Sequence, residues 1–204
     1  MSMHPSLPLF LVGHSMGGGA VLTYAYRGSQ RERLAGVVAW SPMVDLAPSA
    51  QPWYLTLVAG KLAARLLPWL KSYNKLDGSA MSRDADVCND FENDALCHNT
   101  GTLLGLAEML ERAKQLRSRA VQKRFPPKLP VLVLHGSGDR VTWHEASRSF
   151  VDGLQVRDKT YKEYDGWFHK MHAEPGEDRA RFANDVIDWI RARVSGNTVE
   201  GARL

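Results

Sequence analysis

The sequence has little cysteine and no long apolar run. Its 204 residues include only two cysteines, Cys88 and Cys97, which excludes a C-x-x-C motif and a zinc site built on paired cysteines. We expect both to be reduced thiols in a reducing compartment. No stretch approaches the roughly 18 consecutive apolar residues of a membrane-spanning helix. Residues 1–5 show neither the basic nor the apolar part of a signal peptide, so we expect a cytoplasmic protein.

The chain also lacks internal repeats, low-complexity tracts and a strong charge of either sign. Its formal net charge of +4 is only weak evidence for an acidic partner. A composition of 44% hydrophobic and 24% charged residues is ordinary for a globular protein. The length is sufficient for one sizeable domain with a buried core.

One short glycine-rich stretch stands out against this ordinary composition. The residues Gly13-His14-Ser15-Met16-Gly17-Gly18 follow the apolar run 7–12, which predicts a buried strand, and precede the helix-compatible run 20–25. A serine on a sharp turn between a strand and a helix is typical of the nucleophile elbow, G-x-S-x-G. The alternative is a structural serine in a glycine-rich turn.

The elbow requires a strained backbone and a close approach of strand and helix. We therefore expect that a side chain at Gly13, Gly17 or Gly18 would clash with its surroundings. The backbone N–H of Met16, the residue after the serine, would point at an oxyanion formed beside Ser15.

The rest of the chain predicts a parallel α/β sheet interrupted by a helical insertion. Buried strands are expected at 34–41, 131–134 and 160–164, with helices at 145–154 and 178–194. The insertion begins with the apolar stretch 53–70, continues through polar residues without a clear period, and ends with a long helix over 102–124. The predicted parts are a core half at 1–45, a helical lid or cap at 46–125, a second core half at 126–195 and a frayed tail at 196–204.

A serine nucleophile needs a base, and the base needs an orienting acid. Asp139 follows the strand 131–134 and His169 follows the strand 160–164, so both are expected at the same sheet edge as Ser15. The chain order serine, aspartate, histidine is the one typical of this class. The alternatives are Asp45 or Asp165 as the acid and His172 as the base; His14 and His135 are expected to be structural or to line the pocket.

These motifs together resemble the monoglyceride lipase family of serine α/β-hydrolases. The resemblance runs from about residue 7 to 192 and depends on five stretches in a fixed order: the elbow, Ser41-Pro42, Ser82-Arg83-Asp84, the run 135–141 and the run 164–174. It implies Ser15 as nucleophile, Asp139 as acid, His169 as base and the Met16 N–H as oxyanion donor.

The family cleaves monoacylglycerols to fatty acid and glycerol through an acyl-enzyme, without a metal or organic cofactor. The resemblance therefore implies a lipid ester substrate and a lid that contacts membranes or lipid droplets peripherally. Two other interpretations remain open. The protein is an esterase or lysophospholipase that acts on a different substrate, or it is an inactive module that binds a lipid or a partner. No nucleic-acid partner is expected.

The sequence departs from the family pattern before the elbow. The elbow begins at residue 13, so the family's first strands are absent, and no His-Gly loop precedes Ser15 to supply a second oxyanion donor. Loss of one such donor costs about 10²–10³ in rate. We expect the strand 7–12 to have an uncovered edge, and either a partner chain or further residues of a longer product to complete the sheet.

Overall fold

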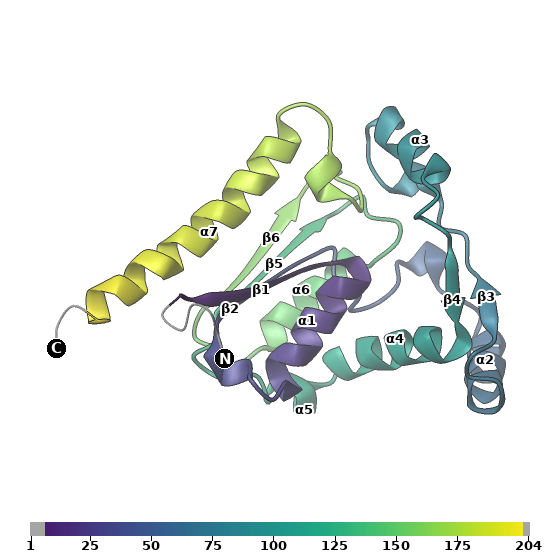
Figure 1. Ribbon diagram of the computed structural model, residues 1–204, viewed down its shortest axis with the longest axis horizontal. Coiled ribbons are helices and arrows are strands. Elements are labelled where there is room, and N and C mark those ends of the chain that lie inside the picture. Colours follow the sequence, from purple (N-terminus) through teal and green to yellow (C-terminus); the bar gives the residue numbers. More distant parts are fainter. Residues whose placement is uncertain (1–6, 202–204) are drawn as a thin grey trace.

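A four-stranded parallel sheet forms the centre of the molecule (Figure 1). The computed structural model describes residues 7–201, without the side chains of residues 54, 55, 57 and 195–201. The spatial order of the strands is β1-β2-β5-β6, and every neighbouring pair is parallel. This confirms the predicted α/β class. The strands are β1 (Leu9–His14), β2 (Leu34–Trp40), β5 (Val131–Gly136) and β6 (Lys159–Tyr164).

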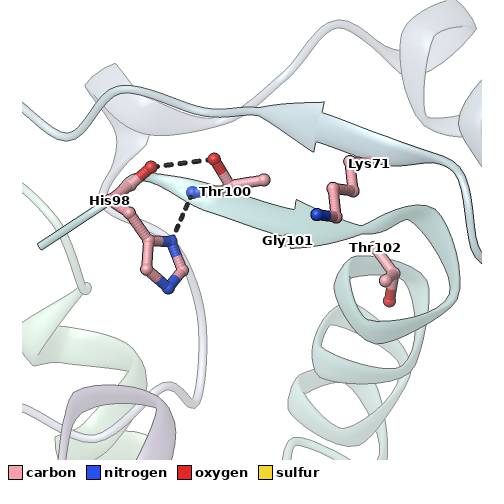
Figure 2. A pocket seen from close by; sticks show the side chains of 5 residues that line it. All are labelled: Lys71, His98, Thr100, Gly101 and Thr102. Atoms are coloured by element: carbon pink, nitrogen blue, oxygen red, sulfur yellow. Dashed lines mark hydrogen bonds between the residues drawn. The ribbon is translucent and has the colours of Figure 1, made fainter. Parts of the chain in front are cut away.

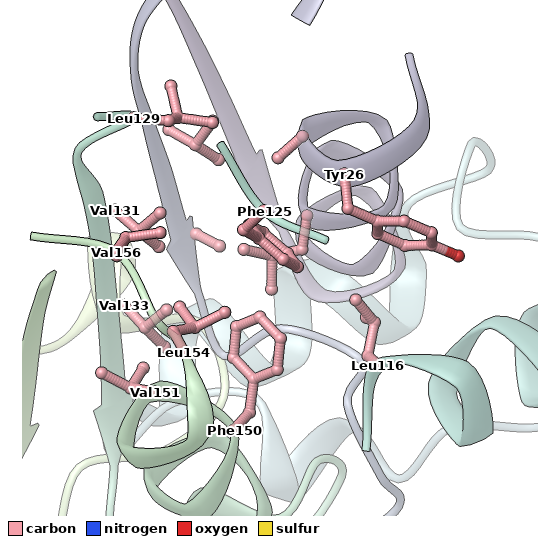
Figure 3. Packing of buried hydrophobic residues seen from close by; sticks show 14 of the residues in the cluster. Tyr26, Leu116, Phe125, Leu129, Val131, Val133, Phe150, Val151, Leu154 and Val156 are labelled. Carbon is pink, nitrogen blue, oxygen red and sulfur yellow. The ribbon is translucent and has the colours of Figure 1, made fainter. Parts of the chain in front are cut away.

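Alternate residues of the central strands face two separate apolar clusters. In β2, Val37 packs into one cluster and Val38 into the other, and both are fully buried. In β5, Val133 and Leu134 divide in the same way. Because side chains of a strand alternate between the faces of a sheet, continuous apolar runs indicate strands covered on both sides. Figure 3 shows the larger cluster, where Phe125 and Phe150 meet at a centroid distance of 5.6 Å.

Helices cover both faces of this sheet. The helices α1 (Ser15–Arg27) and α6 (His144–Gly153) contribute to the larger cluster, and α7 (Asp178–Gly201) contributes Phe182 and Trp189 to the other. The helix predicted over 178–194 is longer than expected, because the backbone of α7 stays helical to Gly201; residues 202–204 of the predicted tail lie outside the described part. Extending an existing helix adds one hydrogen bond per residue without a new nucleation cost.

The segment between β2 and β5 adds no strand to this sheet. It holds, in chain order, α2 (Tyr54–Leu66), β3 (Lys71–Tyr73), α3 (Ala85–Asn93), β4 (Thr100–Thr102), α4 (Leu103–Leu116) and α5 (Arg119–Gln122). The strands β3 and β4 pair with each other as an antiparallel ribbon, which the sequence did not predict. Figure 1 shows α2, α3 and the ribbon together beside the sheet. Within residues 7–201, no helix is long and apolar enough to cross a membrane.

The helix predicted over 102–124 is two helices. The helix α4 ends at Leu116, and the buried side-chain amide of Gln122 donates a hydrogen bond of 3.0 Å to the Leu116 carbonyl. Carbonyls of the last helical turn have no partner within the helix, so this bond satisfies one of them and stabilises the bend into α5.

The first strand lies at the edge of the sheet. Among the described residues, β1 pairs only with β2. The side chains of Leu9 and Val12 are 49% and 46% exposed, so the expectation of an uncovered edge is confirmed. The sequence predicted a buried strand at 7–12, but the strand spans Leu9–His14 and is partly exposed. An apolar run indicates a strand with two covered faces and cannot show which neighbours are present.

The turn from β1 into α1 brings two backbone segments very close together. A Cβ atom on Gly13 would lie 2.5 Å from the Gly17 carbonyl oxygen, and one on Gly18 would lie 2.9 Å from the Cβ of Pro42. Both positions therefore exclude a side chain, as predicted. The same prediction is wrong for Gly17, where a Cβ atom would meet nothing within 4 Å.

These two glycines give a matched pair of stability predictions. Gly13→Ala forces backbone apart and is expected to lower the free energy of unfolding by about 1–3 kcal/mol. Gly17→Ala has open space and a helical position, and is expected to raise the same quantity by up to about 1 kcal/mol. Urea unfolding followed by circular dichroism measures both. Equal effects of the two substitutions would contradict this account of the elbow.

Candidate active site

Ser15 occupies the strained turn between β1 and α1. Its φ of 53° lies in the left-handed region, which few residues other than glycine adopt. The Ser15 carbonyl oxygen accepts a hydrogen bond of 2.8 Å from the Met43 N–H, which anchors the turn to the segment after β2. Strain of this kind persists only where the surrounding structure enforces it, and it is concentrated at functional sites.

The structure brings Asp139 and His169 to this serine. Asp139 lies in the loop after β5 and His169 in the loop after β6, and both are almost completely buried. His169 Nε2 lies 2.9 Å from Ser15 Oγ, and His169 Nδ1 lies 2.8 Å from Asp139 Oδ2. The three side chains thus form one continuous hydrogen-bonded chain across the carboxyl edge of the sheet.

Five donors converge on the buried carboxylate of Asp139. Its Oδ1 accepts the backbone N–H groups of Val141 and Thr142 at 2.7 and 2.9 Å. Its Oδ2 accepts from His169, from the Thr142 hydroxyl at 2.8 Å and from His135 Nε2 at 3.1 Å. Burial alone would raise the pKa of this carboxyl, but the hydrogen bonds from His135 and His169 outweigh burial and hold the pKa well below its usual range.

The carboxylate also fixes the proton positions of both histidines. An ionised carboxylate only accepts, so His169 carries its proton on Nδ1 and leaves Nε2 free to accept the Ser15 hydroxyl proton. Burial lowers the pKa of His135, which favours the neutral ring. Its Nε2–H then donates to Asp139, while its Nδ1 accepts from the Ser147 hydroxyl at 2.9 Å.

His14 supports the base from the other side. Its Nε2–H donates a hydrogen bond of 3.0 Å to the backbone carbonyl of His169, and its ring stacks on Trp40 at a centroid distance of 5.6 Å. Burial, with a further contribution from His169, lowers the pKa of His14 to about 3. The alternative base, His172, accepts the Trp40 indole N–H at 3.2 Å and makes no hydrogen bond to Ser15.

The two alternative acids have other partners. Asp45 forms an ion pair with Arg117 and accepts the Leu46 N–H at 3.0 Å. Asp165 accepts a hydrogen bond of 3.1 Å from the Ser137 hydroxyl. Neither carboxylate is hydrogen-bonded to His169, so among the predicted acids the geometry selects Asp139.

The backbone N–H of Met16 lies in the first turn of α1. The first N–H groups of a helix have no acceptor within that helix, and the positive end of the helix dipole adds to their attraction for an anion. This position is the one expected of an oxyanion donor.

Two further polar residues of this site were not predicted from the sequence. The Thr142 hydroxyl donates to Asp139 and also lies 3.1 Å from the Ser41 carbonyl oxygen, and the buried Ser147 orients His135. The only sequence signal for Thr142 was a hydroxyl residue three positions after an aspartate, a spacing common in loops.

A surface hollow of about 460 Å³ lies on the cap and is separate from these residues. Its lining is His98 and four residues of the β3–β4 ribbon, and Figure 2 shows the hydrogen bonds that the Thr100 N–H and hydroxyl donate to His98. It holds none of the predicted site residues.

Comparison with known proteins gives a consistent result. The family model described as serine aminopeptidase, S33 (Hydrolase_4) matches residues 1–176. A relative from Schizosaccharomyces pombe is 34% identical over 184 residues, which make up 90% of this chain and 48% of that protein. The human monoglyceride lipase is 32% identical over 193 residues, or 94% of this chain and 61% of that protein.

Solved structures show the same fold. A soluble variant of monoglyceride lipase from Saccharomyces cerevisiae, in complex with a substrate analog, superimposes with a TM-score of 0.86 at 25% identity, over 93% of this chain and 63% of that chain. A monoacylglycerol lipase from Paleococcus ferrophilus superimposes with a TM-score of 0.81 at 30% identity, over 91% of this chain and 69% of that chain.

The chain spans about half to two thirds of the length of the curated monoglyceride lipases and related proteins cited above. The matched part contains the elbow and the loops that carry Asp139 and His169. With the parallel sheet and the family match over most of its length, this chain belongs to the serine aminopeptidase S33 family of α/β-hydrolases and is a relative of the monoglyceride lipases.

Proposed function

We propose that this chain carries the catalytic residues of a serine hydrolase that cleaves monoacylglycerols to a fatty acid and glycerol. The observation that supports the proposal is the hydrogen-bonded chain from Ser15 through His169 to Asp139, with distances of 2.9 and 2.8 Å. The relatives named monoglyceride lipases support the choice of substrate.

In the proposed mechanism, Ser15 Oγ attacks the ester carbonyl while His169 Nε2 takes its proton. The N–H of Met16 binds the oxyanion of the tetrahedral intermediate, and Asp139 stabilises the imidazolium. When the C–O bond to glycerol breaks, His169 returns the proton to the leaving alkoxide. Water, deprotonated by the same nitrogen, then attacks the acyl-enzyme, and collapse of the second intermediate releases the fatty acid and restores Ser15.

We propose that polypeptide outside this chain completes the sheet. The exposed Leu9 and Val12 on the unpaired edge of β1 support covering of that edge by further residues of a longer product or by a partner chain. We propose that the same residues supply the second oxyanion donor, for which this sequence shows no His-Gly loop.

A labelling experiment tests the nucleophile. A fluorophosphonate probe is expected to label the chain at Ser15 and to leave Ser15→Ala unlabelled, because the probe reacts with an activated serine hydroxyl. Ser29→Ala is the control: this exposed serine follows the C-terminal end of α1, away from Ser15 at its start, and its loss should leave labelling unchanged. A folded chain that is not labelled would favour the lipid- or partner-binding alternative.

The pH dependence of labelling tests the proton positions. The pKa of Asp139 is held well below its usual range, burial lowers the pKa of His14 to about 3, and burial also lowers the pKa of His135. His14→Gln should therefore leave the shape of the pH–rate profile of labelling unchanged between about pH 5 and pH 8, because the His14 ring is already neutral in that range. A profile that changes shape in this variant would contradict the neutral assignment of His14.

The cap is the proposed contact with lipid. Several of its large apolar side chains are more than half exposed: Trp53, Leu62, Leu66, Leu67, Trp69, Leu70 and Leu96. We call this set the apolar cap surface, and it supports peripheral binding to membranes or lipid droplets in the cytoplasm. The basic residues that follow α4 and α5 support it less, because Arg117 pairs with Asp45 and Arg124 lies over the Tyr26 ring at 5.1 Å.

Vesicle binding tests this surface. Burying one large apolar side chain contributes about 1.5–3 kcal/mol, so Trp69→Ser should weaken co-sedimentation with phosphatidylcholine vesicles about tenfold or more. Leu9→Ser removes a half-exposed apolar side chain from β1, outside the cap, and should leave vesicle binding close to that of the unchanged protein. Equal losses in both variants would contradict a role specific to the cap.

A further inference from the structure

The loop that carries His169 is bound to a buried segment of the cap. We call residues 165–177, between β6 and α7, the base loop, and residues 78–84 of the cap the strap. Ala80, Met81 and Ser82 of the strap are almost completely buried. The bonds between the two segments are His169 N–H to the Ala80 carbonyl (3.4 Å), Lys170 N–H to the Met81 carbonyl (2.6 Å) and Ser82 hydroxyl to the Ala173 carbonyl (2.8 Å).

One fully buried carboxylate joins the two segments. Glu174 Oε1 accepts the Phe168 N–H at 2.5 Å, immediately before His169. Glu174 Oε2 accepts from Arg83 of the strap, from the guanidinium Nε at 2.8 Å and from the backbone N–H at 3.3 Å. Arg83 also pairs with Asp178 at the start of α7, and its guanidinium carbon lies 5.6 Å from the centre of the Trp167 ring.

This arrangement fixes the backbone on both sides of the base. Glu174 holds the N–H of Phe168, the residue before His169, and His14 holds the His169 carbonyl. A buried carboxylate is stable only when it is paired and hydrogen-bonded, so Arg83 is needed to keep Glu174 in place. Glu174 makes no hydrogen bond to Ser15, His169 or Asp139 side chains, so any effect on the reaction is indirect.

We propose that Glu174, held by Arg83, is a positioning residue for His169. It fixes the base loop against the strap, so that Nδ1 stays in line with Asp139 and Nε2 with Ser15. The cap thereby sets the geometry of the base in addition to its proposed contact with lipid. The inference rests on the proposed function only for the role of His169 as the base.

The test uses two substitutions and two matched controls. Glu174→Gln keeps the shape of the side chain but loses the anion, and Arg83→Met removes its partner. The controls are Asp158→Asn and Arg193→Met. Arg193 pairs with Asp158 at 2.6 and 2.9 Å and lies 3.6 Å over the Trp189 ring, at the opposite end of β6. The controls therefore remove an ion pair and a cation–π contact far from His169, although the Asp158 carboxylate is 41% exposed and that of Glu174 is fully buried.

Two readouts are measured on the folded variants. The first is the low-field proton resonance of the His169 Nδ1–H bonded to Asp139, assigned by its loss in His169→Gln. The second is the rate of fluorophosphonate labelling at Ser15. We expect Glu174→Gln and Arg83→Met to broaden or abolish the resonance and to slow labelling at least tenfold, because small displacements of a catalytic group cost up to about 10² in rate.

The controls and the double variant sharpen this expectation. Asp158→Asn and Arg193→Met should keep the resonance and label within twofold of the unchanged protein, even where thermal stability falls equally. The double variant Arg83→Met/Glu174→Gln should label no more slowly than either single variant, because the two side chains act as one unit. Equal slowing in the controls would overturn the inference, since the effect would then follow from lost stability.

An unchanged resonance and an unchanged labelling rate in Glu174→Gln would also overturn the inference.

If Glu174→Gln does not fold, Ser82→Ala replaces it in the test, because that substitution removes only one bond between the strap and the base loop. Ser82→Ala should slow labelling about threefold, and no effect would contradict the inference. If the protein without substitutions shows the resonance but is not labelled, the proposed hydrolase function is contradicted. Loss of the resonance in Glu174→Gln would still support the positioning role. Absence of the resonance in the unchanged protein would overturn it.

Discussion

Five donor groups surround the buried carboxylate of Asp139, and most of the site follows from keeping this anion hydrogen-bonded. The donors come from its own loop, from His135 at the end of β5 and from His169 after β6. A buried anion without such donors would cost several kcal/mol. These hydrogen bonds hold the loops after β5 and β6 together and keep the His169 proton on Nδ1. The nitrogen that faces Ser15 is then necessarily the acceptor.

The parallel sheet makes this convergence possible. The short segments that form the site could be predicted from the sequence. An apolar run followed by a glycine-rich turn specifies the elbow, and polar residues directly after apolar runs identify Asp139 and His169. Each of these signals is contained in a stretch of about ten residues. Because parallel strands place their carboxyl ends at one edge, three local predictions together give the order and approximate location of the site.

Contacts between distant segments were not predictable in this way. Arg83 and Glu174 are 91 residues apart, and nothing in the local pattern of either residue names the other. Gly17 shows the reverse limitation: its glycine suggested a close approach, but its Cβ direction on the first turn of α1 faces open space. The exposure of β1 has the same origin, since a run of apolar residues specifies a strand and not the number of its neighbours.

The strap combines two kinds of contact with different tolerance to substitution. The bonds from His169 and Lys170 to the carbonyls of Ala80 and Met81 use backbone atoms only, so they constrain the path of the chain and place little demand on residue type. The Arg83–Glu174 pair depends on two specific side chains, because a buried carboxylate accepts no apolar neighbour in place of its cation. The strap is therefore held to the base loop in two ways: by backbone bonds that leave residue type open, and by one residue pair that the electrostatics of a single buried anion requires.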